Sequence, residues 1–348
     1  MILITWWGLP QYAARAIGAF VKSTSEEVRI ISTHPVVPIK GMEDLVGCPI
    51  KWVGDEESRN AECGRLWLAE LGELPRIMIV GNWNLAAYKV LEDAVRAGGG
   101  KTVAVSDANY VIDWKQLIRK IRFCFGLKRR FDYFFVPGKS GRKLMRFYGI
   151  PDERIYEGLY AADQNLFKDE TSINHREKKI IYVGQFIERK NVMRLVEAFK
   201  LSKIFEKGWK IEFNGSGILE NALKVEANDY IVVNGFVQPE QLAAKYQEAR
   251  CFILPSLEEH WGVVAHEAAL CGCYLLLSKG IGAADDFATS ENAGVFDPLS
   301  VEDMSKAMKR MAEMSDDEMR CAERISSELG LAAGTQKFVE NMKAMVTR

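Results

Sequence analysis

The sequence lacks the features that would place it in several large classes of protein. Its 348 residues carry a formal net charge of −1, from 46 Lys and Arg against 47 Asp and Glu. A chain this close to neutrality has no overall electrostatic attraction to nucleic acid, so we expect no nucleic-acid partner. No uninterrupted apolar run reaches the ~18 residues that a membrane-spanning helix needs, so we expect no transmembrane segment.

The cysteines form no framework. There are seven, and none belongs to a C-x-x-C pair. Cys271 and Cys273 flank a single glycine, a spacing that fits neither a zinc knuckle nor a thioredoxin-type redox pair. An odd count without a framework indicates reduced thiols, so we expect a cytoplasmic protein. No cluster of metal ligands stands out in the sequence, and we expect no bound metal.

Strand and helix patterns alternate along the whole chain. A chain of 348 residues is too long for one ordinary hydrophobic core, which favours two domains. The strand candidates are near-continuous apolar runs, as expected where helices cover both faces of a parallel sheet. Strands that alternate with helices predict a doubly wound sheet. The expected strands are 1–7, 27–33, 76–81, 102–106 and 132–137 in the first half, and 179–183, 209–214, 230–233, 250–254 and 274–278 in the second.

A polar and charged stretch over 161–178 reads as a linker between the two halves. We therefore predict an α/β fold of two Rossmann-like, doubly wound domains that face each other across a cleft. The domains are expected over 1–165 and 166–348, and the last helix is a candidate to pack back on the first domain. Ligands of such sheets bind beyond the carboxyl ends of the strands, so binding residues are expected just after strands.

The first such motif is "IIYVGQFIERKN", in which Gly184 ends a strand and Arg189 and Lys190 precede a helix. Glycine at that position allows the backbone to approach a ligand closely, and paired cations there suit a diphosphate. The alternative is two solvated cations at a helix start. Positive charge is slightly unfavourable at that end of a helix, which favours an anionic partner.

Two further turns carry weaker signals. "FNGSG" ends a strand in Gly215 and Gly217, and "VVNGFV" ends the next strand with Phe236 and Val237 behind it. An exposed backbone edge at these turns could hold a flat base. Taken separately, each motif is no more informative than a turn that uses glycine for its geometry.

The third motif is "EHWGVVAHE", with Glu259 and Glu267 on either side of a helix that begins at Gly262. The alternative interpretation is an ordinary loop acid followed by an acid on a helix surface. Because Glu259 precedes the helix and Glu267 lies in its second turn, both can face one cleft. The unpaired amides at Gly262, Val263 and Val264 form an anion site. Carboxylates beside it suit sugar hydroxyls, so the pattern favours a ligand that is part phosphate and part sugar.

In this order and spacing, the motifs resemble the retaining glycosyltransferases of the GT-B fold, specifically the family 4 group (glycosyl transferases group 1). The resemblance is dense over 178–298 and includes the family's E-x7-E signature, met by Glu259 and Glu267. It is looser in the first half. It implies an acceptor-binding amino-terminal domain, a donor-binding carboxyl-terminal domain and no cofactor. The implied donor is a nucleotide-diphosphate sugar, and the implied acceptor is a saccharide or a lipid-linked molecule of cell-surface polysaccharide or glycolipid synthesis.

The resemblance also implies roles for the matching residues. Glu267 would bind the ribose hydroxyls and Glu259 the donor sugar near the reacting carbon, while Lys190 would neutralise the departing diphosphate. The amides at Gly262, Val263 and Val264 would hold the diphosphate or the sugar. Gly8 would close on the phosphates from the other domain. The residues that would surround the nucleotide are Gly184, Gly215, Gly217, Phe236 and Val237.

The sequence departs from the family pattern at three points. The amino-terminal loop, "WWGLPQY", lacks the glycine pair that is often seen there. Gln185 stands where many members have an arginine, and Arg189 is a candidate to replace that cation. No histidine is evident on the later strand of the first half, where Asp107 occupies a comparable strand end and becomes the candidate to meet the acceptor. There is no D-x-D motif suited to a divalent metal. We therefore expect Lys190, Arg189 and the helix amides to stabilise the leaving group without one.

Two features of the first half have competing interpretations. The segment 113–135, "DWKQLIRKIRFCFGLKRRFDYFF", mixes cations with apolar residues. It is either a surface helix with an apolar inner face or a membrane-surface patch for a lipid-phosphate-linked acceptor, which would make the protein peripheral on the inner face of the membrane. Trp6 and Trp7 favour a core and cleft-wall position over a platform for a sugar.

Two other functions fit the same architecture. A nucleotide-sugar epimerase would release an altered sugar nucleotide and need no acceptor. A non-catalytic sugar-nucleotide-binding protein is the other possibility, but it would not explain the charge of Lys190.

Overall fold

The computed structural model describes residues 1–35, 41–110, 119–120 and 123–347. The chain forms two compact units, unit 1 over Met1–Ala161 with Thr335–Arg348, and unit 2 over Ala162–Gly334. The division therefore falls at Ala161 and not at residue 165. Directly after this boundary, the buried Ala162 amide donates a hydrogen bond of 3.1 Å to the His266 ring of unit 2.

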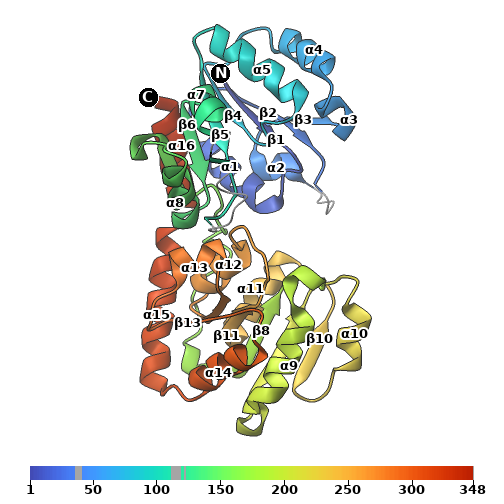
Figure 1. Cartoon of the computed structure of the whole chain (residues 1–348), viewed down its shortest axis with the longest axis vertical. Coiled ribbons are helices and arrows are strands. Elements are labelled where there is room, and N and C mark those ends of the chain that lie inside the picture. The colour runs from blue at the N-terminus through green and yellow to red at the C-terminus, as the bar shows by residue number, and fades with distance from the viewer. Residues whose placement is uncertain (36–40, 111–118, 121–122, 348) are drawn as a thin grey trace. The chain divides into compact units, whose positions relative to one another are not determined.

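Unit 1 is built on a parallel sheet of seven strands in the order β3-β2-β1-β4-β5-β6-β7 (Figure 1). Its strands are β1 (Ile2–Trp6), β2 (Val28–Thr33), β3 (Ile50–Val53), β4 (Ile77–Val80), β5 (Lys101–Val105), β6 (Tyr133–Val136) and β7 (Ile155–Glu157). Its helices are α1 (Gln11–Ser23), α2 (Met42–Val46), α3 (Asp55–Ser58), α4 (Ala61–Leu71), α5 (Ala86–Ala97), α7 (Lys128–Arg130), α8 (Lys139–Phe147) and α16 (Thr335–Thr347).

Both faces of this sheet are buried. Ile2 and Ile4 of β1 belong to a core that includes residues of α1, α2 and α16. Leu3, between them, belongs to a second core with residues of α4, α5 and α8. Successive side chains of a strand point to opposite faces, so a strand covered on both sides must be apolar throughout. This explains why β1 reads as a continuous apolar run.

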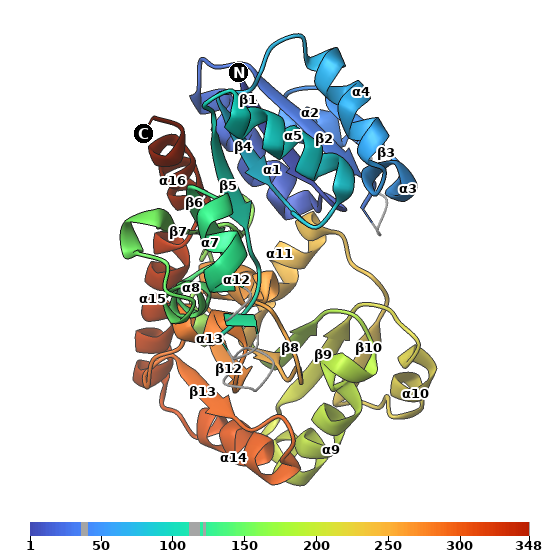
Figure 2. The same ribbon diagram turned by 45° about the horizontal axis from the view of Figure 1, so that its top comes forward.

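Helix α16 completes unit 1 although it follows unit 2 in the chain. Figures 1 and 2 show it in dark red beside β6. Phe338 packs against Phe135 of β6 with ring centroids 5.3 Å apart. The Asn341 side chain donates a hydrogen bond of 2.7 Å to the Glu157 carbonyl of β7. The helix therefore belongs to the core of unit 1.

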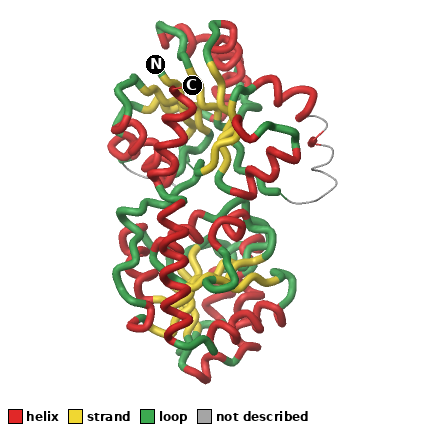
Figure 3. Tube along the Cα trace, turned by 90° about the vertical axis from the view of Figure 1, so that its left-hand side faces the viewer, coloured by secondary structure: helices red, strands yellow, loops and turns green. Residues whose placement is uncertain are grey.

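Unit 2 is built on a parallel sheet of six strands in the order β10-β9-β8-β11-β12-β13. Figure 3 shows the strands of each unit in yellow between helices in red. The strands are β8 (Glu177–Val183), β9 (Lys210–Asn214), β10 (Ile231–Asn234), β11 (Ala249–Leu254), β12 (Tyr274–Ser278) and β13 (Ala293–Phe296). The helices are α9 (Val192–Ser202), α10 (Glu220–Val225), α11 (Pro239–Glu248), α12 (Val263–Leu270), α13 (Gly282–Phe287), α14 (Val301–Ala312) and α15 (Asp316–Ala332).

The predicted α/β class, with two doubly wound parallel sheets, is confirmed. The ten expected strands are present, and the three strands that the sequence did not reveal, β3, β7 and β13, all lie at the edge of a sheet. An edge strand is short and only partly buried, as β3 and β13 are, and it lacks the continuous apolar run of a central strand. The expected linker over 161–178 extends too far, because β8 already begins at Glu177.

The strand order locates the binding regions. In unit 1 the direction of winding reverses between β1 and β4, and in unit 2 between β8 and β11. Open parallel sheets bind ligands outside the carboxyl ends of the strands at such a reversal. The loops after β1 and β4 and after β8 and β11 are therefore where a site is expected.

Candidate functional site

The loops after β8 and β11 of unit 2 are held together by hydrogen bonds. Asn191 lies at the end of the first loop in the left-handed conformation, with φ of 61°. Its side-chain amide donates to the Pro255 carbonyl at 3.1 Å and to the Pro298 carbonyl at 2.7 Å. The Leu257 amide donates to the Arg189 carbonyl at 2.9 Å. These contacts fix the position of the two loops relative to each other.

The two loops bring Lys190 and Glu259 into an ion pair. Both side chains are largely buried, with 12% and 15% of their surface exposed. Arg189 is more exposed and lies 3.9 Å from the same carboxylate, while its guanidinium donates a hydrogen bond of 2.6 Å to the Glu258 carbonyl. The predicted cations and the first predicted acid therefore meet where the strand order reverses. No feature of the sequence predicts that Glu259 itself neutralises Lys190.

Helix α12 begins at Val263, directly after Gly262, which is its N-cap residue. Gly262 has φ of 98°, and a Cβ atom there would lie 2.9 Å from the Leu254 side chain, so only glycine fits. Among the described residues, no side chain caps the helix, and its first amides at Val263 and Val264 lie next to the loop that carries Glu259. Uncapped amides at a helix start attract anions.

Glu267 lies in the second turn of α12 and has different partners from Glu259. The Tyr246 hydroxyl of α11 lies 3.1 Å from its carboxyl oxygen Oε2 and 3.3 Å from the Val264 carbonyl. Burial raises the pKa of Glu267 to about 8, against the opposing effect of the Tyr246 hydrogen bond. The carboxyl group is therefore largely protonated at neutral pH in the ligand-free protein.

His266 anchors the same helix, a role that the sequence did not reveal beyond packing. Its Nδ1 accepts the Ala162 amide at 3.1 Å, so the ring proton is on Nε2, which lies 2.8 Å from the Gly330 carbonyl of α15. The ring stacks on Phe287 with centroids 5.0 Å apart. Burial lowers the pKa of His266 to about 4 and keeps the ring neutral. A lone histidine in a helix carries no sequence signal for such contacts.

The predicted nucleotide glycines serve loop packing. Gly184, Gly215 and Gly217 have φ between 152° and 157°. A Cβ atom on Gly215 would lie 1.9 Å from the Gly184 carbonyl oxygen, and one on Gly217 would lie 2.4 Å from the Phe186 carbonyl oxygen. The Gly215 amide already donates to the Gly235 carbonyl at 3.1 Å. Close approach of loop to loop therefore accounts for these glycines without a ligand.

The rest of the predicted base pocket lies after β10. Phe236 is 59% exposed, and Val237 is partly buried. Their contact with a base stays a prediction.

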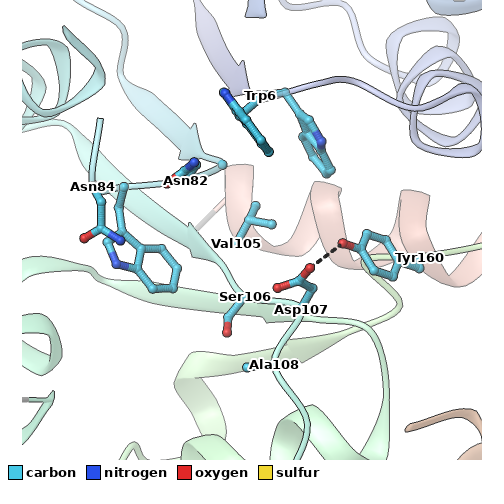
Figure 4. Close-up of a pocket in the computed structure, with 11 residues that line it drawn as sticks. Trp6, Asn82, Asn84, Val105, Ser106, Asp107, Ala108 and Tyr160 are labelled. Atoms are coloured by element: carbon cyan, nitrogen blue, oxygen red, sulfur yellow. Dashed lines mark hydrogen bonds between the residues drawn. The ribbon is translucent and has the colours of Figure 1, made fainter. Parts of the chain in front are cut away.

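Unit 1 has a cavity of about 330 Å³ where its own strand order reverses. Figure 4 shows Asp107, which follows β5, facing Tyr160, whose hydroxyl lies 3.4 Å from Asp107 Oδ2. The predicted acceptor residue therefore lies in a cavity. The lining comes from the ends of β1, β4 and β5 and from Tyr160, and comprises Trp6, Trp7, Gly81, Asn82, Trp83, Asn84, Val105, Ser106, Asp107, Ala108 and Tyr160.

Gly8 lies just beyond this cavity, in the loop after β1. It has φ of 66°, and its amide donates a hydrogen bond of 2.7 Å to the Thr33 hydroxyl of β2. That bond holds the turn to the neighbouring strand. The predicted contact of Gly8 with phosphates stays a prediction.

A second cavity, of about 520 Å³, adjoins the first and shares Trp83, Asn84, Ser106 and Ala108 with it. It includes part of the segment 113–135 for which a membrane contact was predicted. Of that segment, 113–118 and 121–122 lie outside the described residues. Arg130 turns inward, where it forms an ion pair with the buried Glu92 and donates to the Trp83 carbonyl at 3.0 Å. The membrane contact stays a prediction.

Two further properties concern the whole described part of the chain. No group of three or more His, Cys, Asp or Glu side chains within it could hold a metal ion. None of its helices has both the length and the apolar composition that crossing a bilayer requires.

Comparison with known proteins identifies unit 2. Residues 163–327 match the family model of glycosyl transferases group 1. An uncharacterized glycosyltransferase of Methanocaldococcus jannaschii, MJ1607, is 26% identical over 167 residues, which cover 43% of this chain and 42% of that protein. The serotype-specific mannosyltransferase WbdA of Escherichia coli is 21% identical over 199 residues, which cover 51% of this chain and 24% of that protein. The chain thus aligns with less than half the length of either relative.

Comparison of structures extends to both units. The crystal structure of Anabaena HepE in complex with UDP and glucose matches with a TM-score of 0.75 and covers 99% of each chain, at 13% sequence identity. At this identity the match shows a shared fold. Together with the two parallel sheets, it shows that the fold is GT-B. The chain has the GT-B fold, and residues 163–327 of its second unit match glycosyl transferases group 1.

Proposed function

We propose that the chain is a retaining glycosyltransferase that moves a sugar from a nucleotide-diphosphate sugar to an acceptor without a metal ion. The observation that carries this proposal is the Lys190–Glu259 pair beside the uncapped start of α12, in a unit of the glycosyl transferases group 1 family. The arrangement offers cations and amides to a diphosphate and carboxyl groups to hydroxyls. That HepE was crystallised with UDP and glucose supports a nucleotide sugar as the donor.

In this proposal the donor binds to unit 2. The amides at Gly262, Val263 and Val264 hold the diphosphate, and Glu267 accepts ribose hydroxyls. The base lies against the loops that carry Phe236 and Val237.

Lys190 changes partner when the donor binds. In the ligand-free protein it is neutralised by Glu259. Once the diphosphate arrives, Lys190 and Arg189 neutralise the charge that develops on the leaving phosphate as the bond to the sugar breaks. Glu259, released from Lys190, then binds sugar hydroxyls near the reacting carbon. A catalyst that uses two side chains and helix amides in this way needs no divalent cation.

The acceptor binds to unit 1, where Asp107 contacts it in the cavity after β5. WbdA is a serotype-specific mannosyltransferase, which supports a role in cell-surface polysaccharide synthesis. Glycolipid synthesis is the related alternative.

The test uses the full chain and a panel of UDP-, GDP- and ADP-sugars, with chelator present. We expect one donor to raise the free energy of unfolding by ~2.7 kcal/mol at 100 times its dissociation constant. Mass spectrometry should then detect the free nucleoside diphosphate and a glycosylated acceptor, and NMR of that product should show that the anomeric configuration is retained. Activity that disappears with chelator would contradict the metal-free mechanism.

The same products distinguish the alternatives. An epimerase would release an altered sugar nucleotide without an acceptor. A binding protein would be stabilised by the donor but would never cleave it. Either result would overturn the proposal.

A further inference from the structure

We propose that Tyr246 is a positioning residue, whose hydroxyl holds the Glu267 carboxyl group in one orientation in both of its protonation states. None of the sequence motifs includes this tyrosine. That the ligand of Glu267 is a nucleotide rests on the proposed function, whereas the contact between the two side chains does not.

Packing fixes the Tyr246 ring in place. The side chain lies on α11 and is fully buried. Its ring packs edge-on against Phe167 and Phe252, with centroids 5.9 Å and 6.0 Å away. Burial, and to a lesser extent the nearby Glu267, holds the pKa of the phenol well above its usual range. The hydroxyl is therefore a rigidly held group that keeps its proton.

This hydroxyl spans one turn of α12. It lies 3.1 Å from Glu267 Oε2 and 3.3 Å from the Val264 carbonyl oxygen. The two residues are three positions apart, so they lie on the same side of the helix. Both belong to the proposed nucleotide site, Val264 through its amide and Glu267 through its carboxyl group. One buried hydroxyl thus contacts both parts of that site.

The two contacts suit both forms of the carboxyl group. A hydroxyl donates one hydrogen and can also accept, whereas a main-chain carbonyl only accepts. When Glu267 is protonated, its Oε2–H can donate to the Tyr246 oxygen while the Tyr246 hydroxyl donates to Val264. When Glu267 is ionised, the Tyr246 hydroxyl can turn and donate to the carboxylate. The carboxyl group therefore keeps a partner, and need not move, when its proton leaves for solvent.

Tyr246 is also the group that favours ionisation of Glu267. Within the described part of the chain, burial and Tyr246 alone shift the pKa of Glu267, burial upward and the hydrogen bond downward. The neighbouring Cys271, whose amide donates to the Glu267 carbonyl at 3.1 Å, has a thiol that burial keeps neutral by raising its pKa well above the usual range. Removal of the Tyr246 hydroxyl should therefore raise the pKa of Glu267 further.

The position of α12 does not depend on this hydroxyl. His266 precedes Glu267 and points about 100° away around the helix. Its ring accepts the Ala162 amide at 3.1 Å and lies 2.8 Å from the Gly330 carbonyl oxygen. These contacts hold α12 from another side. Loss of the Tyr246 hydroxyl should thus affect the Glu267 carboxyl group and leave the helix where it is.

The first test is Tyr246→Phe in the full chain, which removes the hydroxyl and keeps the ring contacts. NMR of ¹³C-labelled glutamate carboxyl groups follows the titration of Glu267, and the spectrum of Glu267→Gln assigns its signal. We expect the midpoint of this titration to rise by about one pH unit, which is about tenfold in proton affinity. Tyr274→Phe is the matched control, because Tyr274 is a buried tyrosine on β12 that does not influence the pKa of Glu267.

The second test measures binding of UDP, GDP and ADP by calorimetry from pH 6 to pH 9. We expect the nucleotide that binds the wild type to bind Tyr246→Phe about tenfold more weakly at pH 7, because a smaller fraction of Glu267 is ionised. The pH dependence of binding should move upward by the same pH unit. A purely structural role of Tyr246 would weaken binding without moving that dependence.

Two results would overturn the inference: a Glu267 midpoint in Tyr246→Phe equal to that of the wild type, or weaker nucleotide binding with an unchanged pH dependence. If the midpoint moves but no nucleotide binds the wild type, the proposed function fails and the role of Tyr246 is supported. If nucleotide binds the wild type and the midpoint does not move, this inference alone is refuted.

Discussion

The two units of the chain share one sheet topology and differ in the loops that follow their strands. Both sheets begin from a first strand, add two strands on one side and continue on the other, so each reverses its winding at the corresponding place. In unit 2 the loops at this place carry Arg189, Lys190 and Glu259. In unit 1 the corresponding cavity is lined by indoles, amides and one carboxylate. The scaffold thus determines where a ligand binds, and the loop residues determine its chemistry.

In the proposed function, this difference between the loop residues of the two units corresponds to two kinds of substrate. Cations and helix amides suit a ligand that gains negative charge during the reaction, as a leaving diphosphate does. Indoles and amides suit a ligand that stays neutral. The following predictions test this division, beginning with the largest expected effect.

Lys190→Ala should lower kcat for sugar transfer by ~10²–10³, because removing one group that stabilises the developing charge costs a few kcal/mol of barrier. Steady-state kinetics measures the effect, and circular dichroism checks the fold. Lys200→Ala is the matched control, since Lys200 is an exposed lysine on α9 that pairs with Glu226. If Lys190→Ala is nearly as active as the wild type, the cation of unit 2 does not stabilise a leaving diphosphate, and the proposed chemical difference between the two units is wrong.

Gly215→Ala should lower the free energy of unfolding by about 2 kcal/mol, because φ is 154° and the new Cβ would collide with the Gly184 carbonyl. Urea unfolding measures the change. The control is Gly235→Ala, where a Cβ meets nothing within 4 Å. If both variants are equally stable, loop packing is not the reason for the glycine at 215, and a ligand contact becomes the better explanation.

Nucleotide affinity should increase about tenfold between about pH 6 and pH 7. The pKa of Glu267 is about 8, so the carboxyl group is largely protonated in the free protein at pH 6 to 7, whereas both of its oxygens can accept ribose hydroxyls only when it is ionised. Binding therefore releases a proton, which calorimetry in buffers of different ionisation enthalpy detects. Glu267→Gln should bind more weakly and without this dependence. An affinity that is independent of pH in the wild type would contradict the role of Glu267.

The same raised pKa makes the free energy of unfolding decrease as the pH rises, whereas the nucleotide affinity increases. The folded, ligand-free protein holds a proton on Glu267 that the unfolded chain releases above about pH 4.5. The stability that this proton contributes is therefore complete below about pH 4.5 and is lost as the pH rises toward 8. A nucleotide that binds the ionised form should offset part of this loss.

The sequence predicts the central strands well because burial on both faces requires an uninterrupted apolar run, as in β1 and β11. The edge strands β3, β7 and β13 escape prediction because one side has no neighbour and polar residues are tolerated there, whereas the edge strand β10 keeps an apolar run and is predicted. For the site, the position of Lys190 and Glu259 after strands follows from local motifs. Their pairing does not, because it depends on how two loops 69 residues apart meet.

Other features of the site had no local signal at all. Tyr246 reaches Glu267 from a different helix, and only the three-dimensional packing of α11 against α12 brings them together. Trp7 follows an apolar strand, which predicts a place in the core or in the wall of a cleft, and the structure places it in the lining of a cavity with a large part of its surface exposed. A tryptophan at a strand end is compatible with both positions, and only its surroundings decide between them.

The position of α16 after unit 2 in the sequence affects the order in which the two units can fold. Phe338, Met342 and Met345 fill the core of unit 1, yet they are translated only after all of unit 2. Until then, the face of the amino-terminal sheet that α1 and α2 also cover lacks the side chains of α16, and apolar surface exposed in this way is prone to aggregation. Unit 2, continuous in sequence, has no such delay. The ribosome therefore completes the second unit before the first can close, the reverse of the usual order for consecutive domains.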